Sequence, residues 1–263
     1  MSELPALLST TIAWMCRIAA LAVAVNALEL LTIHRALSDR GVWRAPLLSP
    51  QWGVWRRVLG ARVFAAVLVA QLALAVIMAA APGTTAGCLA AATLAFTGWL
   101  SALRFRGNVN GGSDAMLFTV LGGLAVAQLP NVAITVHEAG ILYVAAQLTL
   151  SYVRAGIVKV KERSWWTGHA LAAFLALPAY GVPAWVPRSV PKDLAWLRVA
   201  SVGVIGFECL APLAWFSPVA CAVVIAAALA FHTATAAVFG LNRFLLAWGA
   251  GLPSLWYAVH RVA

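Results

Sequence analysis

Apolar residues run along this chain in long stretches that short polar clusters separate. A helix needs about 20 apolar residues to cross the hydrocarbon core of a bilayer. Measured against that length, the stretches predict an all-α, polytopic membrane helix bundle of nine spans, or of eight if one is re-entrant. The predicted spans are 11–33, 61–81, 85–103, 115–134, 139–157, 167–186, 196–215, 217–238 and 241–258. One membrane domain then covers residues 1–263.

Polar residues weaken three of these predicted spans. The fourth and fifth are separated by only a short stretch, Ala133–Glu138. Glu208 and Pro212 interrupt the seventh span, and Pro253 lies within the ninth. Such breaks are tolerated where neighbouring helices or a cavity satisfy the freed backbone groups.

The composition excludes an ordinary soluble protein. Hydrophobic residues make up 63% of the chain and charged residues 10%, against roughly 45–50% and about 25% in soluble domains. The net charge of +10 does not indicate nucleic-acid binding, because in a membrane protein basic residues mark the cytoplasmic loops. Membrane lipid is therefore the expected surrounding. The four cysteines show no CxxC or zinc spacing and are expected to be buried apolar residues.

The loops differ in basic charge, which predicts the orientation of the chain. Odd-numbered connections carry most of the arginines and lysines between spans, and the loop at 187–195 departs from this trend with Arg188 and Lys192. Cytoplasmic loops are enriched in Lys and Arg. The protein is therefore expected in the cell membrane, multi-pass, with the N-terminus outside and the C-terminus inside.

Among the ionisable residues within the predicted spans, Glu208 in the seventh span and His232 in the eighth stand out. A charged group there costs about 2.5–3.5 kcal/mol or more. Both residues are therefore candidates for a functional site. The alternative is a hydrogen-bonded structural residue in the bundle core.

A turn-forming cluster occupies residues 104–114, where Asn110 precedes a glycine pair. The plain interpretation is a loop in which Ser113 or Asp114 caps a helix that starts near Ala115. The functional interpretation adds Arg104, because an arginine and exposed backbone N–H groups at a helix start can bind an anion or an oxyanion.

A second cluster, residues 152–168, combines Gly156, Lys159, Lys161 and Trp165. Gly156 favours a close approach of two helices, and Trp165 marks a membrane interface. The two lysines are either water-exposed positive-inside charges or residues of a desolvated pocket. In such a pocket a lysine can act as a general base.

Taken together, short segments of this chain resemble the HTTM family, the horizontally transferred transmembrane domain shared with vitamin K-dependent gamma-carboxylase. The matching segments are Glu29–His34 with the Gly-Val-Trp43 loop, Asn110–Asp114, Tyr152–Lys159 followed by Trp165-Trp-Thr-Gly168, and His232 followed by Phe239–Phe244. The piece Asn110–Asp114 also resembles HTTM proteins that mature secreted peptide toxins in bacteria.

The resemblance implies a gamma-carboxylase-like enzyme that modifies a peptide or small substrate. Its cofactor would be a reduced, vitamin K-like quinone, with carbon dioxide and dioxygen as co-substrates. Lys159 matches the lysine base, with Lys161 as the alternative counterpart and His232 as a second catalytic residue. The residues expected to bind the cofactor are Arg104, Asn110, Asp114, Trp165, Glu208 and Arg243.

Two expectations follow from this assignment. Replacing Lys159 with alanine should abolish activity and leave stability nearly unchanged, and a laterally open cavity should lie beside Lys159 and His232. The carboxylase works on the lumenal side, whereas the charge pattern places Lys159 inside, so the side of the membrane on which it works stays open.

Two other classes of function remain open at the level of sequence. The first is a non-catalytic membrane partner, for maturation of or immunity to a secreted peptide. The second is a transporter, because broken helices and intramembrane ions also serve transport.

Overall fold

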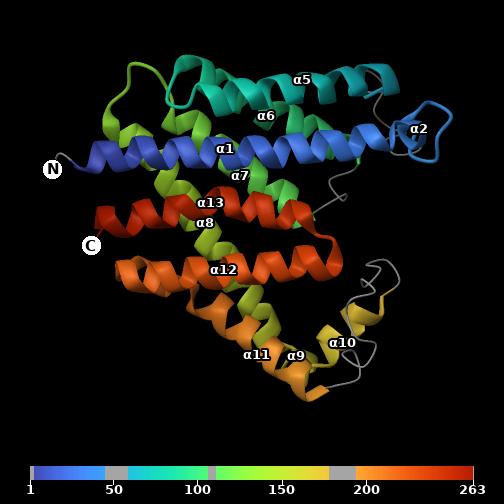
Figure 1. Ribbon diagram of the computed structural model, residues 1–263, viewed down its shortest axis with the longest axis vertical. Coiled ribbons are helices and arrows are strands. Elements are labelled where there is room, and N and C mark those ends of the chain that lie inside the picture. Colours follow the sequence, from blue (N-terminus) through green and yellow to red (C-terminus); the bar gives the residue numbers. More distant parts are fainter. Residues whose placement is uncertain (1–2, 45–58, 106–110, 178–193, 263) are drawn as a thin grey trace. The chain divides into compact units, whose positions relative to one another are not determined.

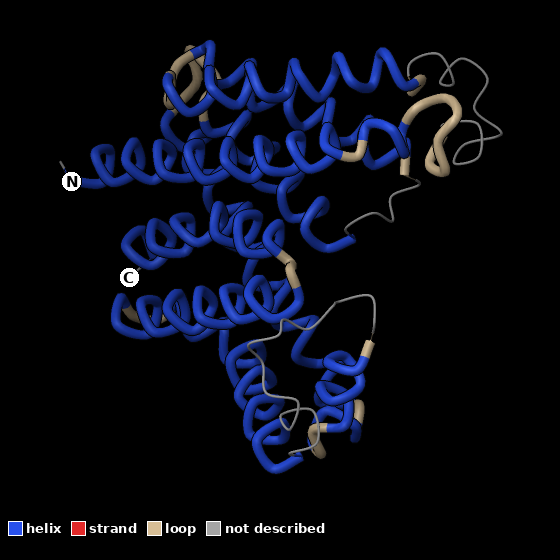
Figure 2. The backbone as a smooth tube through the Cα atoms, turned by 45° about the vertical axis from the view of Figure 1, so that its right-hand side comes forward, coloured by secondary structure: helices blue, strands red, loops and turns tan. Residues whose placement is uncertain are grey.

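The computed structural model describes residues 3–44, 59–105, 111–177 and 194–262, and every regular element in these ranges is a helix (Figure 2). The α-helices are α1 (Glu3–Thr32), α2 (His34–Leu37), α5 (Ala61–Ala80), α6 (Thr85–Arg104), α7 (Gly111–Ala127), α8 (Ile134–Lys161), α9 (Arg163–Trp166), α10 (His169–Ala176), α11 (Leu194–Leu210), α12 (Pro218–Phe239) and α13 (Asn242–Val262). A 3₁₀ helix, η3 (Ala211–Trp215), follows α11. The all-helical expectation is confirmed for these residues.

Within the described ranges, six helices are long and apolar enough to cross a membrane, which makes the chain a multi-pass helical membrane protein by length and composition. They are Pro5–Thr32, Ala61–Ala80, Thr85–Arg104, Ile134–Lys161, Leu194–Trp215 and Pro218–Phe239. The shorter helix α7 coincides with the predicted fourth span, and α13 with the ninth. Of the predicted span 167–186, the structure describes α10 and Leu177, and residues 178–186 lie outside the described ranges.

The helices form two compact units. Unit 1 contains Met1–Val144 and Leu246–Ser254, and unit 2 contains Ala145–Leu245 and Leu255–Ala263. In unit 1, α5 packs against both α1 and α6, and α6 packs on α7 (Figure 1). A buried apolar cluster joins α1, α2, α5 and the end of α6, through Ala27, Leu30, Leu37, Phe64, Leu68 and Phe105.

The turn between α7 and α8 lies earlier than the sequence predicts. The expected break at 133–138 is wrong, because α7 ends at Ala127 and α8 begins at Ile134. Pro130 has no N–H for a helical hydrogen bond, and Asn131 adopts a positive φ of 58°. The turn-forming residues therefore end α7 at Ala127, although the run of apolar residues continues beyond it.

Two helix starts also differ from the predicted ones. The helix expected near Ala115 begins at Gly111, and the first helix begins at Glu3 rather than near residue 11. The first helical turn has no intrahelical partners for its N–H groups, so Pro5 fits in the first turn of α1. The proposed cap at Ser113 or Asp114 is therefore wrong, since both residues lie inside α7.

In unit 2, Pro212 ends α11 and starts η3, as the sequence predicts. Ser217 then caps α12, because its hydroxyl oxygen accepts a hydrogen bond from the Ala220 N–H. Gly240 ends α12 with a φ of 68°, a left-handed conformation that glycine adopts without strain. By contrast, Pro253 does not interrupt α13, which is helical throughout its length.

Candidate functional site

One face of α8 carries the polar residues of the candidate site. Thr149, Tyr152, Gly156 and Lys159 recur at intervals of three or four residues, so they lie in a row along the helix. This row of residues packs against η3, α11 and α12, which come later in the chain. At its first member, the indole N–H of Trp215 in η3 donates to the Thr149 hydroxyl oxygen over 2.9 Å.

Gly156 lets α11 approach α8 closely, as the sequence predicts. A Cβ atom at this position would lie 2.7 Å from Cys209 Sγ, 3.0 Å from the Cys209 backbone nitrogen and 3.1 Å from Glu208 Cβ. Real Cβ atoms do not sit that close to other heavy atoms, so only glycine leaves room. The close approach brings the Glu208 side chain within reach of the next turn of α8.

Lys159 and Glu208 form a mostly buried ion pair at this crossing. The Lys159 Nζ lies 2.7 Å from each carboxylate oxygen of Glu208. The Glu208 side chain is 3% exposed and the Lys159 side chain 15% exposed. Two charges removed from water are stable together only when each faces the other with good geometry. The pair therefore depends on both partners.

Trp165 covers the ammonium group of Lys159. Its ring centre lies 5.1 Å from Nζ, within the range of a cation–π contact. The Trp165 ring also packs against Phe174 of α10, with centroids 5.9 Å apart. Gly168 follows with a φ of 82°, and a Cβ there would lie 2.7 Å from the Arg198 backbone nitrogen on α11. A glycine at 168 is thus needed for the turn that brings α10 against α11.

Tyr152 and His232 form a second buried pair, between α8 and α12. The Tyr152 hydroxyl lies 3.0 Å from His232 Nε2, and both side chains are 2% exposed. Phe207 packs edge-on against Tyr152 at 4.8 Å, and Phe231 packs against His232 at 5.0 Å between centroids. Apolar rings thus surround two groups that can exchange a proton.

These contacts place two proton-exchanging pairs two helical turns apart on α8. Tyr152 and His232 form the first pair, and Lys159 and Glu208 the second. In each pair a group that can donate a proton faces one that can accept it, which is the arrangement that acid–base chemistry needs.

The structure brings four of the predicted site residues together in unit 2: Lys159, Trp165, Glu208 and His232. Lys161 is exposed at the end of α8. Lys159, two residues earlier on the same helix, makes the contact with Glu208. Arg243 is half-buried at the start of α13.

The other predicted cofactor-binding residues belong to unit 1 or lie outside the described residues. Asp114 is half-buried in the first turn of α7. Asn110 lies outside the described residues, so its cofactor role stays a prediction. The two clusters that the sequence analysis joined into one site therefore fall in separate units.

Arg104, at the end of α6, binds backbone carbonyls of its own unit. Its guanidinium group is fully buried and donates to the carbonyl oxygens of Leu59, Leu37 (2.8 Å) and Trp43 (3.1 Å). The ring of Phe64 lies under it, with 4.7 Å from the guanidinium carbon to the ring centre. The planar fork of an arginine suits several acceptors at once. These contacts give Arg104 a structural role, joining α6 to the residues on either side of segment 45–58.

Tyr152 is the functional candidate that sequence reasoning did not assign a role. The usable signal was its position seven residues before Lys159, which puts both side chains on one helix face. The partner, His232, comes from a helix eighty residues away in the sequence.

Comparisons of this chain with protein-family models, with curated proteins and with solved structures found no match. The class that the fold defines is thus a multi-pass helical membrane protein with buried acid–base pairs in one of its two units.

Proposed function

We propose that this chain is an integral-membrane enzyme of the gamma-carboxylase-like type, which uses a lipid quinol and a lysine base to modify a peptide or small substrate. The observation that carries the proposal is the Lys159–Glu208 pair, in which both carboxylate oxygens lie 2.7 Å from Nζ. The proposal includes membership of the HTTM family and nine membrane crossings, with the N-terminus outside and the C-terminus inside.

The chemistry of the pair supports a base at Lys159. Glu208 is almost fully buried, whereas Lys159 keeps limited access to its surroundings. Transfer of the ammonium proton to Glu208 leaves a neutral amine at the more accessible position. The amine then takes a proton from a bound hydroxyl group, and Lys159 again becomes an ammonium. The net result is that one proton moves from the bound hydroxyl group to the Glu208 carboxylate, with Lys159 as the group that passes it on.

The residues around the pair fit an uncharged ring with hydroxyl groups. Trp165 offers a flat aromatic face beside Lys159. A reduced quinone bound there would supply a ring hydroxyl that reacts with dioxygen once its proton is removed. Trp165 would orient the ring, Lys159 would accept the proton, and Glu208 would hold the lysine in place. His232 and Tyr152 form the second proton-exchanging pair of the proposed site.

The test uses the whole chain, purified and reconstituted into phosphatidylcholine vesicles. Reduced vitamin K, dioxygen, radiolabelled bicarbonate and a glutamate-rich peptide are supplied, and quinol oxidation and label in the peptide are measured. Lys159→Arg is the informative variant, because arginine keeps the charge and the ion pair but does not give up its proton. We expect activity to fall by at least about 100-fold, since general bases contribute about 10²–10⁴-fold.

Lys161→Arg is the matched control, because Lys161 is exposed two residues along the same helix. We expect it to keep its activity. Quinol oxidation that survives in Lys159→Arg would refute the lysine base. A wild-type chain that neither oxidises the quinol nor labels the peptide, while copurifying with a secreted peptide, would favour the non-catalytic partner. Solute movement across the vesicles would favour the transporter.

A further inference from the structure

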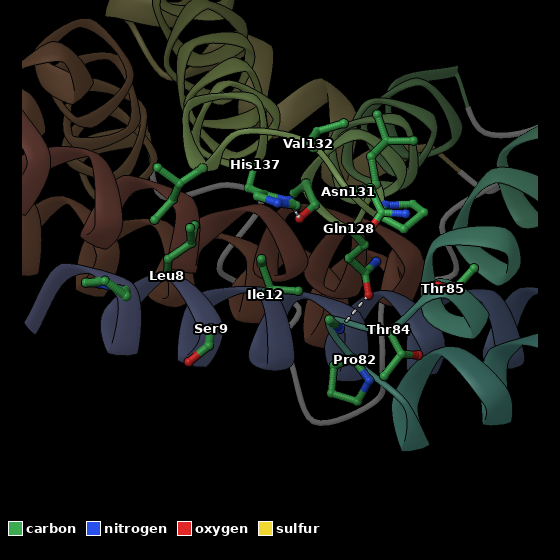
Figure 3. Close-up of a pocket in the computed structure, with 16 residues that line it drawn as sticks. Leu8, Ser9, Ile12, Pro82, Thr84, Thr85, Gln128, Asn131, Val132 and His137 are labelled. Carbon is green, nitrogen blue, oxygen red and sulfur yellow. Dashed lines mark hydrogen bonds between the residues drawn. The ribbon is translucent and has the colours of Figure 1, made fainter.

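A cavity of about 700 Å³ opens at one end of unit 1, apart from the residues of the proposed enzyme site. It lies where α1 starts, where α5 turns into α6 and where α7 turns into α8 (Figure 3). Ligand pockets in proteins measure about 300–1,000 Å³. Five helices start or end here, and the ends of membrane-spanning helices are expected at the depth where lipid headgroups meet hydrocarbon.

Two turns form the rim of the cavity, and the Gln128 side chain holds one of them in place. The Gly83 N–H donates to the Gln128 Oε1 over 2.8 Å, and the Gln128 amide nitrogen donates to the Leu124 carbonyl over 3.0 Å. Gly83 and Asn131 adopt positive φ angles of 75° and 58°. Gln128 is 4% exposed, so the site is supported by a buried hydrogen-bonded side chain.

The lining is apolar on one side and polar on the other. Leu8 and Ile12 of α1 contribute apolar side chains, and His137 lies across from Ile12 (Figure 3). Among the described residues that line the cavity, none carries an aspartate, glutamate, lysine or arginine side chain. A ligand with a net charge would lose its hydration there without a counter-charge, which is costly. The cavity therefore suits an uncharged amphiphile.

Hydrogen bonding determines which polar group the amphiphile needs. The Thr84 hydroxyl donates to the Ala81 carbonyl over 2.8 Å. The His137 Nδ1 lies 2.8 Å from the Ala127 carbonyl oxygen. Because a carbonyl only accepts, Nδ1 carries the hydrogen, and Nε2 of the neutral ring then presents a lone pair. The Thr84 oxygen already accepts from the Gly87 N–H over 3.1 Å, so His137 Nε2 is the acceptor that calls for a donor from the ligand.

We infer that this cavity binds an uncharged lipid whose head carries a free hydroxyl group, donated to the acceptor nitrogen of His137, with its acyl or alkyl tail along Leu8 and Ile12. Two kinds of lipid have this chemistry, a diacylglycerol and an alkylated hydroquinone. The inference does not rest on the proposed enzymatic function, because all the residues that carry it belong to unit 1.

The test measures thermal unfolding of the full chain in detergent with short-chain probes. We expect dioctanoylglycerol or a decyl hydroquinone, well above its Kd, to raise the Tm by about 3 °C or more. Trioctanoylglycerol and the dimethyl ether of the hydroquinone keep the tails and lack the hydroxyl hydrogen, so neither should shift the Tm. The probe that gives the larger rise in Tm, the diacylglycerol or the hydroquinone, identifies the kind of lipid that the cavity binds.

Two variants with matched controls assign the effect to the cavity. His137→Phe should weaken binding at least about tenfold, since a lost hydrogen bond of about 1.4 kcal/mol is a factor of ten. His34→Phe is its control, because His34 makes the same type of Nδ1 contact to a backbone carbonyl and does not line the cavity. Thr85→Trp should fill the cavity and abolish the shift, whereas Leu89→Trp, an exposed position on α6, should not.

If His137→Phe does not fold, Thr85→Trp still tests the inference, because Thr85 is exposed and tolerates a larger side chain. The inference is overturned if neither hydroxyl-bearing probe shifts the Tm. It is also overturned if the shift survives in both His137→Phe and Thr85→Trp, or if dioctanoyl phosphatidate or an alkylamine binds and the uncharged probes do not.

Discussion

Glu208 of α11 holds the Lys159 ammonium of α8 with both of its carboxylate oxygens, each 2.7 Å from Nζ. The close crossing at Gly156 makes this contact possible. A buried ion pair adds little net stability over apolar residues of the same size, but removal of one partner leaves the other charge buried alone. The pair therefore changes the prediction for Lys159→Ala, which should lose stability as well as activity.

The first prediction separates the two partners. Glu208→Leu should lower the free energy of unfolding by about 3 kcal/mol, because Lys159 is left without its carboxylate. Adding Lys159→Met should recover most of that loss, since no unpaired charge remains. Thermal unfolding in detergent measures both variants, and Lys161→Met is the exposed control. Equal destabilisation in the single and double variants would contradict the pair's role.

The second prediction concerns the buried hydroxyl of Tyr152. Tyr152→Phe keeps the ring that packs on Phe207 and removes the partner of His232 Nε2. We expect a loss of about 1 kcal/mol, the usual net value of a buried hydrogen bond. Tyr143→Phe, on the same helix and 50% exposed, should have no effect. The same loss in a His232→Ala background would show that the hydroxyl acts independently of the histidine.

The third prediction tests the helix crossing with a pair of glycines. Gly156→Ala should destabilise the protein by about 1–3 kcal/mol, because the added Cβ overlaps Cys209. Gly203→Ala, on α11 with open space at its Cβ, should be neutral or stabilising, because alanine favours helix over glycine. Comparing the two Tm values separates packing from helix propensity. A stable Gly156→Ala variant would show that α8 and α11 are farther apart than described.

The fourth prediction addresses Arg104. Arg104→Lys keeps the charge, but a single ammonium group cannot satisfy the carbonyls of Leu59, Leu37 and Trp43 with the same geometry. We expect a loss of at least about 2 kcal/mol, because buried carbonyls are left without donors. Arg154→Lys, at an exposed position of α8, is the matched control. An unchanged Tm in Arg104→Lys would leave the residue available for the predicted cofactor role.

The hydrophobic pattern predicted most helices because a bilayer demands long apolar segments with internally satisfied backbones. It placed α5, α6 and α12 within a residue or two. It misplaced the turn before α8, because apolar residues continue past Ala127 and only Pro130 and Asn131 carry the turn signal. It also started α7 about four residues too late, because the glycine pair at 111–112 is typical of a loop.

The candidate site was only partly predictable from the same chain. Glu208 and His232 stood out because charged or titratable residues are rare and costly in an apolar span, and Lys159 stood out as part of the polar cluster 152–168. The sequence did not show that Glu208 faces Lys159, because a single span gives no information on which neighbour it meets. Arg104 stood out as part of the turn-forming cluster 104–114, but its contacts in the fold are with backbone carbonyls.

Composition and apolar run length by themselves determined that this is a helical membrane protein and which of its residues are unusual at that depth. Both properties depend on single segments and their transfer from water to lipid. Tertiary structure alone decided the partners: Glu208 for Lys159, His232 for Tyr152, and backbone carbonyls for Arg104. Partner choice depends on which helix faces meet and how closely, and those distances are set by packing between residues far apart in the chain.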